Sequence, residues 1–216
     1  MEPGRPRGLS RQRATLVNTR SRETRLALVG AALGLWSNGD FDEAYEASTA
    51  ADIARAAGVS KGTFYFHFAN KEALLLEMSS GTIQAMIDQV EAGTGQGVPL
   101  RSLSEQMMAL MARRVVRTPK AAALRAGALG FTARTDGTMA NPRLNVAFET
   151  LLRYGKERGE LGAQVDVDDT AAMMTAVTME AIIRWGRDDR SASWLSQTLR
   201  DRVAVVLRGV SQEGDS

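Results

Sequence analysis

The sequence predicts an all-α protein of about nine helices, and two observations carry this prediction. Apolar residues recur at spacings of three and four along most of the 216-residue chain, which is the period of an amphipathic helix. Glycines, prolines and capping residues separate these segments at regular intervals, and no segment shows the strict alternation of a half-buried strand.

Residues 1–18 are predicted to form a basic, disordered arm. Residues 1–25 hold seven arginines against two glutamates, and the first ten residues include two prolines and two glycines. This composition disfavours a packed structure. Such an arm could follow a DNA backbone or enter a minor groove, or it could be a solubilising leader, and the sequence leaves both readings open.

A first helix is expected from about Arg20 to Ser37, with its buried stripe formed by Leu26, Val29, Leu33 and Trp36. This stripe has helical spacing, and the Asn-Gly pair that follows is a stop signal. Residues 40–48 are then expected to form an acidic loop.

Residues 49–72 predict two short helices joined by a tight turn. Thr49 can cap the first helix with Asp52 as its capping-box partner, Gly58 can end it, and Ser60 can cap the second. Two short helices joined in this way form a helix-turn-helix, which places its second helix in the major groove of DNA.

The second of these helices has a small, polar and basic outer face, which suits DNA. Lys61, Gly62 and Thr63 are expected to approach base edges, because they are basic, small or hydrogen-bonding at the start of the helix. Tyr65, His67 and Lys71 suit phosphates. An ordinary helical hairpin with a solvated face is the alternative.

These residues resemble the TetR family of bacterial transcription regulators. The resemblance rests on Thr49, Ile53, Ala54, Ala57, Gly58, Val59, Ser60, Gly62, Thr63, Tyr65, His67, Phe68, Lys71, Glu72 and Leu74. It implies base and backbone contacts by Lys61, Gly62 and Thr63, and phosphate contacts by Thr49, Ser60, Tyr65, His67 and Lys71. The segment between Gly39 and Thr49 is longer than in the family pattern. The runs YFHF and Pro119 to Gly127 also look somewhat like the γ-butyrolactone receptors of this family.

Beyond this region, further helices are expected at about 70–90, 100–117, 120–134, 142–158, 168–186 and 193–210. The glycine-rich break at 93–99 and the Asn141-Pro142 pair are the clearest punctuation. The predicted organisation is a three-helix helix-turn-helix DNA-binding domain at 19–72, followed by a larger helical ligand-binding and dimerisation domain at 73–216.

Methionines suggest a ligand cavity in the second domain, because their flexible, polarisable side chains suit varied apolar ligands. The expected lining residues are Met107, Met108, Met111, Arg125, Phe131, Phe148, Met174 and Trp185. A plain methionine-rich core is the alternative.

The last two helices are expected to form a homodimer interface. An apolar stripe on the final helix and small residues on the one before it carry this prediction. The expected interface residues are Ala172, Ala176, Leu195, Leu199, Val203 and Val206. Two-fold symmetry would present two recognition helices to a roughly palindromic operator. The alternative is that both stripes face the chain's own core.

Composition disfavours an enzyme, a metalloprotein and a membrane protein. The chain has no cysteine and one histidine, and that histidine is assigned to the DNA face. No catalytic group, metal site or cofactor is therefore expected. No apolar run is long enough to span a membrane, and a cytoplasmic location is expected.

The predicted function is that of a ligand-relieved repressor, which binds a double-stranded DNA operator as a homodimer and releases it when an unknown small molecule binds. A transcriptional activator of the same fold is one alternative. A DNA-binding protein without sequence preference is the other, because phosphate contacts alone would give salt-dependent binding to any DNA.

Overall fold

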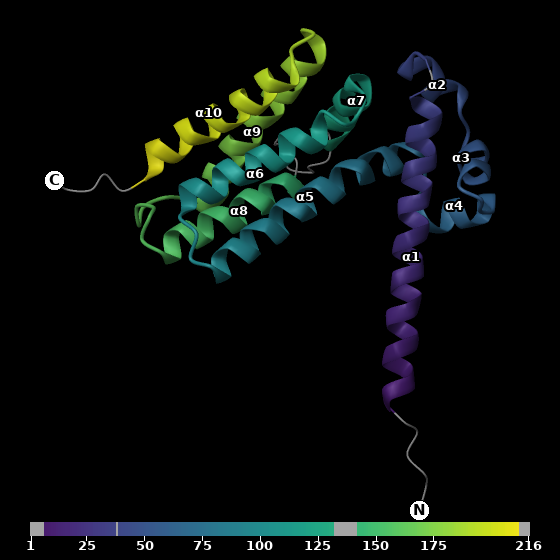
Figure 1. Cartoon of the computed structure of the whole chain (residues 1–216), viewed down its shortest axis with the longest axis horizontal. Coiled ribbons are helices and arrows are strands. Elements are labelled where there is room, and N and C mark those ends of the chain that lie inside the picture. The colour runs from purple at the N-terminus through teal and green to yellow at the C-terminus, as the bar shows by residue number, and fades with distance from the viewer. Residues whose placement is uncertain (1–6, 38, 132–141, 212–216) are drawn as a thin grey trace, which may run out of the picture. The chain divides into compact units, whose positions relative to one another are not determined.

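The computed structural model describes residues 7–37, 39–131 and 142–211, with side chains described from residue 19 onward except at 130–131 and 142. These ranges contain ten α-helices and no β-strand, only an isolated bridge between Leu161 and Ser211 (Figure 1). The helices are α1 (Arg7–Trp36), α2 (Phe41–Ala47), α3 (Ala50–Ala56), α4 (Lys61–His67), α5 (Lys71–Gly95), α6 (Leu100–Val115), α7 (Lys120–Phe131), α8 (Pro142–Glu157), α9 (Val167–Arg187) and α10 (Ala192–Val210). The all-α prediction is confirmed.

The chain forms two compact units, one ending at Leu74 and the other beginning at Leu75. In the N-terminal unit, α1 packs against α2 and α3, and α3 packs against α4. Aromatic residues dominate its core: the ring of Trp36 lies 4.9 Å from that of Tyr45 and 6.0 Å from that of Phe41. The indole nitrogen of Trp36 donates a hydrogen bond to Ser48 Oγ at 2.8 Å, so this buried polar atom is satisfied.

The expected loop at 40–48 is wrong, because most of it is the helix α2. Asp40 caps this helix by accepting a hydrogen bond from the Glu43 amide at 3.0 Å. Phe41 and Tyr45 are four residues apart and therefore share the face that packs against Trp36. Asp42 and Glu43 lie in the first turn, where negative charge is favourable.

The structure also corrects the first helix. It begins at Arg7, not near Arg20, and its buried stripe is Leu28, Ala32 and Trp36, whereas Leu26 is 63% exposed. Residues 26–36 read LALVGAALGLW, so apolar or small residues surround the helix. Periodicity alone could not select the buried face in such a segment.

The C-terminal unit is a helical bundle with one continuous core. In this unit α10 packs against α6 and α9, α8 packs against α6 and α9, and α7 packs against α9 (Figure 1). Asp166 caps α9 by accepting a hydrogen bond from the Asp169 amide, and Ser191 caps α10 by accepting one from the Trp194 amide. None of the helices in the described ranges is long and apolar enough to cross a membrane.

Candidate DNA interface and ligand cavity

The turn between α3 and α4 has the local geometry that the sequence predicted. Thr49 and Asp52 form a capping box, with the Asp52 amide 3.2 Å from Thr49 Oγ1 and the Thr49 amide 3.0 Å from Asp52 Oδ2. Hydrogen bonds from the Thr49 side chain and backbone lower the pKa of the Asp52 carboxyl below its ordinary range.

The helix α3 ends in a Schellman motif at Gly58. This glycine has φ of +70°, its amide donates to Arg55 O at 3.1 Å, and the Val59 amide donates to Ala54 O at 2.9 Å. Ser60 then caps α4 by accepting from the Thr63 amide at 3.0 Å. The angle between the two helices is thus specified by hydrogen bonds on both sides of the turn.

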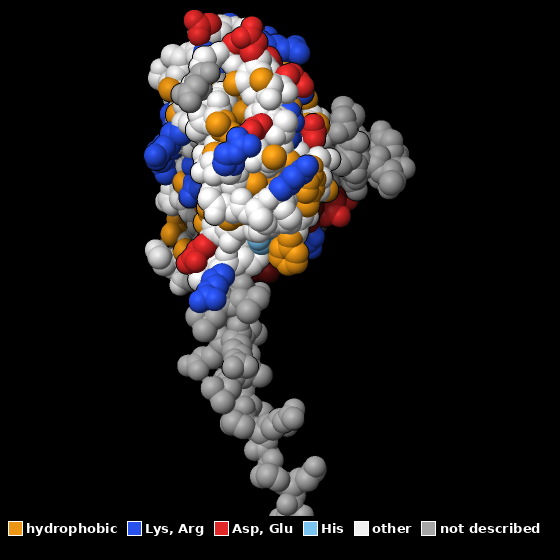
Figure 2. Space-filling model, turned by 90° about the vertical axis from the view of Figure 1, so that its right-hand side faces the viewer, with side chains coloured by type: hydrophobic (Ala, Val, Ile, Leu, Met, Phe, Trp, Pro, Cys, Tyr) orange, Lys and Arg blue, Asp and Glu red, His pale blue; other side chains and the backbone are white. Residues whose placement is uncertain are grey.

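The helix α4 has one face in the core and one in solvent. Phe64 and Phe68 are buried, with their rings 6.0 Å apart, and they anchor the helix. Lys61 and Gly62 are exposed, Tyr65 is 52% exposed and Phe66 is 82% exposed. Figure 2 views the side on which α3 and α4 lie in Figure 1, and basic and apolar side chains are both accessible there.

Five of the predicted contact residues sit where α3 and α4 begin: Thr49, Ser60, Lys61, Gly62 and Thr63. The Thr49 hydroxyl donates to Asp52 Oδ2 at 2.6 Å, and the hydroxyls of Ser60 and Thr63 lie 2.8 Å apart. A Cβ atom added at Gly62 would meet only Ser60 Oγ, at the ordinary contact distance of 3.6 Å. Nothing in the protein's own packing therefore requires a glycine at position 62.

Lys71, which the sequence predicts to contact a phosphate, has partners for its ammonium group within the protein. Lys71 Nζ donates to Tyr45 O at 2.6 Å and to Ser48 O at 2.9 Å, and it lies 4.4 Å from the centroid of the Tyr45 ring. These carbonyls end α2, where a cation satisfies the unpaired acceptors. Lys71 therefore links α5 to α2.

His67 is half-buried at the end of α4. Its ring meets the Phe66 ring edge-on, with centroids 5.0 Å apart, and its carbonyl accepts from Arg25 Nη1 at 2.9 Å. Burial lowers the pKa of His67 below its ordinary value, and repulsion by Arg25 lowers it further. The neutral imidazole is thus favoured near neutral pH, and it can donate one hydrogen bond to a phosphate.

Two residues outside the predicted contact set belong to this region. Phe66 is the more exposed of the two outward-facing aromatics on α4, and its place one turn after Gly62 was the signal that could have identified it. The guanidinium group of Arg25 lies 4.4 Å from the centroid of the Phe68 ring, so α1 holds the end of α4 through both this contact and the bond to His67 O.

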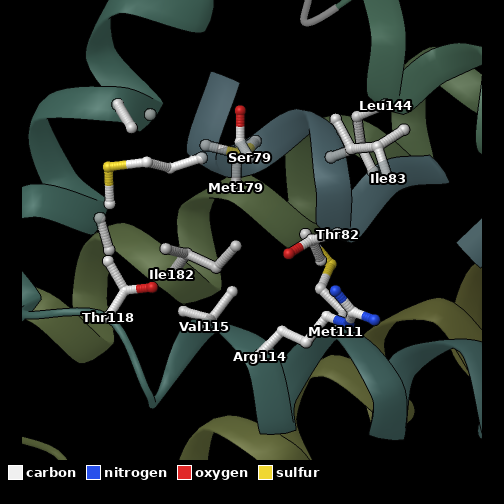
Figure 3. Close-up of a pocket in the computed structure, with 14 residues that line it drawn as sticks. Ser79, Thr82, Ile83, Met111, Arg114, Val115, Thr118, Leu144, Met179 and Ile182 are labelled. Carbon is white, nitrogen blue, oxygen red and sulfur yellow. The ribbon is translucent and has the colours of Figure 1, made fainter. Parts of the chain in front are cut away.

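A separate cavity of about 80 Å³ lies within the C-terminal unit (Figure 3). Helices α5 to α9 and the turn after α6 contribute to its walls. Its lining residues are Met78, Ser79, Thr82, Ile83, Met111, Arg114, Val115, Thr118, Ala123, Ala126, Gly127, Leu144, Met179 and Ile182.

Of the predicted cavity residues, Met111 alone lies in this described lining. Met107, Met108, Phe148, Met174 and Trp185 are buried in the packed core, and Arg125 is half-buried outside the lining. Phe131 lies outside the residues whose side chains are described. On α6 the cavity is lined by Met111, Arg114 and Val115, which lie about one turn or more beyond Met107 and Met108.

The predicted dimer surface is also partly wrong. Leu195, Leu199 and Val203 are at most 1% exposed and belong to the chain's own core, and Ala172 is half-buried. Ala176 and Val206 instead line a surface groove together with Val177, Glu180, Asp201, Arg202 and Val205. The apolar stripe on α10 that predicted a dimer interface is its inward face. The sequence pattern therefore identified the contact of α10 with the chain's own core, and not a contact with a second copy.

Comparison with known proteins agrees with this geometry. The family model "Bacterial regulatory proteins, tetR family" matches residues 41–78, which contain α2, α3, α4 and the start of α5. The chain is similar to the HTH-type transcriptional repressor KstR2 of Rhodococcus jostii, with 23% identity over 169 residues, covering 76% of this chain and 82% of that protein. An uncharacterized HTH-type transcriptional regulator of Bacillus subtilis, YwcC, is 32% identical over 84 residues, covering 36% of this chain and 38% of that protein.

The fold is also known from solved structures. The TetR-family repressor FadR of Thermus thermophilus superposes with a TM-score of 0.64 at 23% identity, covering 89% of this chain and 98% of that chain. The family model over the helix-turn-helix and the repressor relative support a DNA-binding transcriptional regulator of the TetR family, and the solved structure shows that the fold is shared.

Proposed function

We propose that the protein is a ligand-relieved repressor that binds a roughly palindromic operator as a homodimer. The observation that carries the proposal is the exposed face of α4, whose outward side chains have no part in the core while Phe64 and Phe68 anchor the helix from behind. A rigidly held helix with a small, basic start is what major-groove recognition requires.

The proposed roles follow from position on this helix. Lys61, Gly62 and Thr63 approach base edges, because they form the first turn and Gly62 allows close approach. Tyr65 and neutral His67 donate hydrogen bonds to phosphates, as does Ser60 at the start of α4. Thr49 contacts a phosphate when its hydroxyl exchanges its bond to Asp52 Oδ2 for one to the DNA. Phe66 makes an apolar contact with a sugar or a thymine methyl group.

Dimerisation is proposed through the exposed sides of α9 and α10. Met173 is 52% exposed and Val205 is 58% exposed, and the groove beside Val205 is bounded by Ala176 and Val206. Arg202 pairs with Glu180 and donates to Val177 O across the groove, so the polar groups in it are already satisfied. An apolar strip with satisfied polar groups suits a second copy.

Ligand relief is proposed from the cavity in the C-terminal unit. The structure of Thermus FadR holds lauroyl-CoA, so a regulator of this fold accommodates a small molecule. A ligand that binds more tightly to the DNA-free pose must weaken operator binding by the same factor by which operator DNA weakens ligand binding. Such a regulator acts on chromosomal DNA, which places it in the cytoplasm, and the proposal assigns it no catalytic role.

Operator binding is tested by fluorescence anisotropy with DNA from upstream of the protein's own coding region. Random-sequence DNA is expected to compete at least a hundredfold less well, in line with specific recognition. Lys61→Met and Tyr65→Phe should weaken specific binding, whereas Arg187→Gln on α9 removes an exposed charge elsewhere and serves as the control. Equal competition by random DNA would leave the alternative of sequence-independent binding.

Two further measurements test the remaining parts. Sedimentation should give the mass of a dimer for the wild type, and Val205→Asp should shift it toward the monomer because a charge would be buried in the interface. A reporter gene behind the operator should be more active when the regulator gene is deleted. Lower activity in the deletion strain would identify an activator in place of a repressor.

A further inference from the structure

The cavity in the C-terminal unit combines apolar walls with a single charged group. Most of its walls come from Met, Ile, Val, Leu and Ala side chains, and three hydroxyl groups, those of Ser79, Thr82 and Thr118, break this surface. Arg114 is the one charged residue among the described residues that line it, and none of them is acidic. The cavity therefore has a positive end and an otherwise apolar interior.

Arg114 is placed at the mouth of the cavity in a way that leaves donors for a ligand. Its side chain is exposed, and Nη1 makes one long hydrogen bond, 3.4 Å, to Gly81 O on α5. Among the described residues no carboxylate forms an ion pair with it. Figure 3 shows its guanidinium group on the same side of the cavity as Thr82 and Met111. A guanidinium group has five N–H donors, so most of them are not used by Gly81.

We propose that this cavity binds an apolar molecule that ends in a carboxylate, with the apolar part among Met111, Met179 and Ile182 and the carboxylate on Arg114. Guanidinium and carboxylate match in geometry and charge, and two parallel hydrogen bonds fix the orientation of the bound molecule. The hydroxyl of Thr82 lies on that side and can donate a further hydrogen bond. A cationic head group would be repelled, and a neutral one would gain less.

The inference rests on the proposed function in one respect, which is that the bound molecule is taken to be the effector that releases the operator. Binding of that molecule to the cavity can be measured without DNA. Four probes separate the two parts of the ligand: octanoate, octan-1-ol, octylamine and acetate. Isothermal titration calorimetry with the full chain should give the tightest binding for octanoate. Octan-1-ol should bind about tenfold more weakly, because it lacks a charge-assisted bond at a partly exposed site. Acetate and octylamine should bind more weakly still.

Two arginine variants test the anchor. Arg114→Gln should lower the octanoate affinity about tenfold and leave the octan-1-ol affinity unchanged. The matched control is Arg113→Gln, which removes the neighbouring exposed charge on the same helix but not from the lining. Ala126→Leu should weaken both probes, because the added carbons fill the cavity, and its circular dichroism spectrum and melting temperature report whether it folds.

The outcomes distinguish this inference from the repressor proposal. Equal affinity for octanoate and octan-1-ol, an unchanged octanoate affinity in Arg114→Gln, or no binding of either probe at millimolar concentration would overturn the inference. If octanoate binds as expected but operator DNA stays bound in anisotropy, the assignment of the cavity stands and octanoate-driven relief fails.

Discussion

Replacing Lys71 with methionine should destabilise the N-terminal unit and leave the proposed DNA contacts of α4 intact. The ammonium group of Lys71 joins the start of α5 to two carbonyls at the end of α2, those of Tyr45 and Ser48. Methionine keeps a similar apolar stem but donates no hydrogen bond. The substitution therefore leaves both carbonyls without this donor in a part-buried site.

The size of the effect follows from three contacts. Each charge-assisted hydrogen bond contributes about 1–1.5 kcal/mol once partial exposure is taken into account. The contact with the Tyr45 ring, at 4.4 Å, adds roughly 0.5–1 kcal/mol. The expected loss is about 3 kcal/mol of unfolding free energy. For a unit of this size, it corresponds to a fall of roughly 10 °C or more in the unfolding midpoint.

The assay is thermal unfolding of wild type, Lys71→Met and Lys61→Met, followed by operator binding at several salt concentrations. Lys61 lies on the exposed face of α4, so its replacement should weaken DNA binding without lowering the midpoint. Each lost phosphate contact should lower the slope of log affinity against log salt by about 0.9. Lys71→Met should leave that slope unchanged at a temperature where the variant is folded.

The opposite pattern would refute the reasoning. If Lys71→Met melts like the wild type but has a smaller salt slope, then Lys71 contacts a phosphate in the complex, and its bonds to α2 contribute little to stability.

Three further predictions concern the turn and the single histidine. Gly58→Ala should cost about 1 kcal/mol because of the positive φ, and Gly58→Asn less; equal melting of both with wild type would contradict this. Thr49→Val should raise the pKa of Asp52 by removing its largest cause of lowering. The lowered pKa of Asp52 stabilises the fold at pH values above the ordinary 3.8. The difference in melting temperature between wild type and Thr49→Val should therefore narrow in acid, and a constant difference down to about pH 2 would contradict this prediction. The imidazole of His67 should titrate below pH 6.5 by NMR, and Arg25→Gln should raise that midpoint without bringing it to 6.5. Because the unfolded chain binds this proton more readily, the free energy of unfolding should fall as the pH drops below 6.5. A wild-type midpoint above 6.5 would exclude burial as the cause of the shift.

Local hydrogen bonding explains why the sequence predicted the helix-turn-helix well. Thr49, Gly58 and Ser60 act on amides and carbonyls within a few residues, so their spacing in the chain is enough to specify the caps. The exposed residues of α4 follow from the same local pattern, because Phe64 and the C-cap residue Phe68 bury one side of this seven-residue helix.

Contacts between distant segments could not be predicted in this way. The partners of Lys71 lie 23 and 26 residues earlier in the chain, in a segment that the sequence predicted to be a loop. Leu195, Leu199 and Val203 form a good apolar stripe, but a stripe does not state whether it faces the chain's own core or a second copy. The cavity depends on where helices α5 to α9 fail to fill space, and Met111 belongs to it whereas Met107 does not.

The division of α4 into an anchoring side and an open side has a consequence for how this regulator can evolve. Substitutions at Lys61, Tyr65 or Phe66 leave Phe64 and Phe68 in place, so they can alter which DNA is preferred at little cost to folding. If the proposed DNA contacts hold, a duplicated copy of the gene could therefore acquire a new operator through a few surface changes, while the cavity proposed to bind the ligand, which lies in the other unit, stays unchanged.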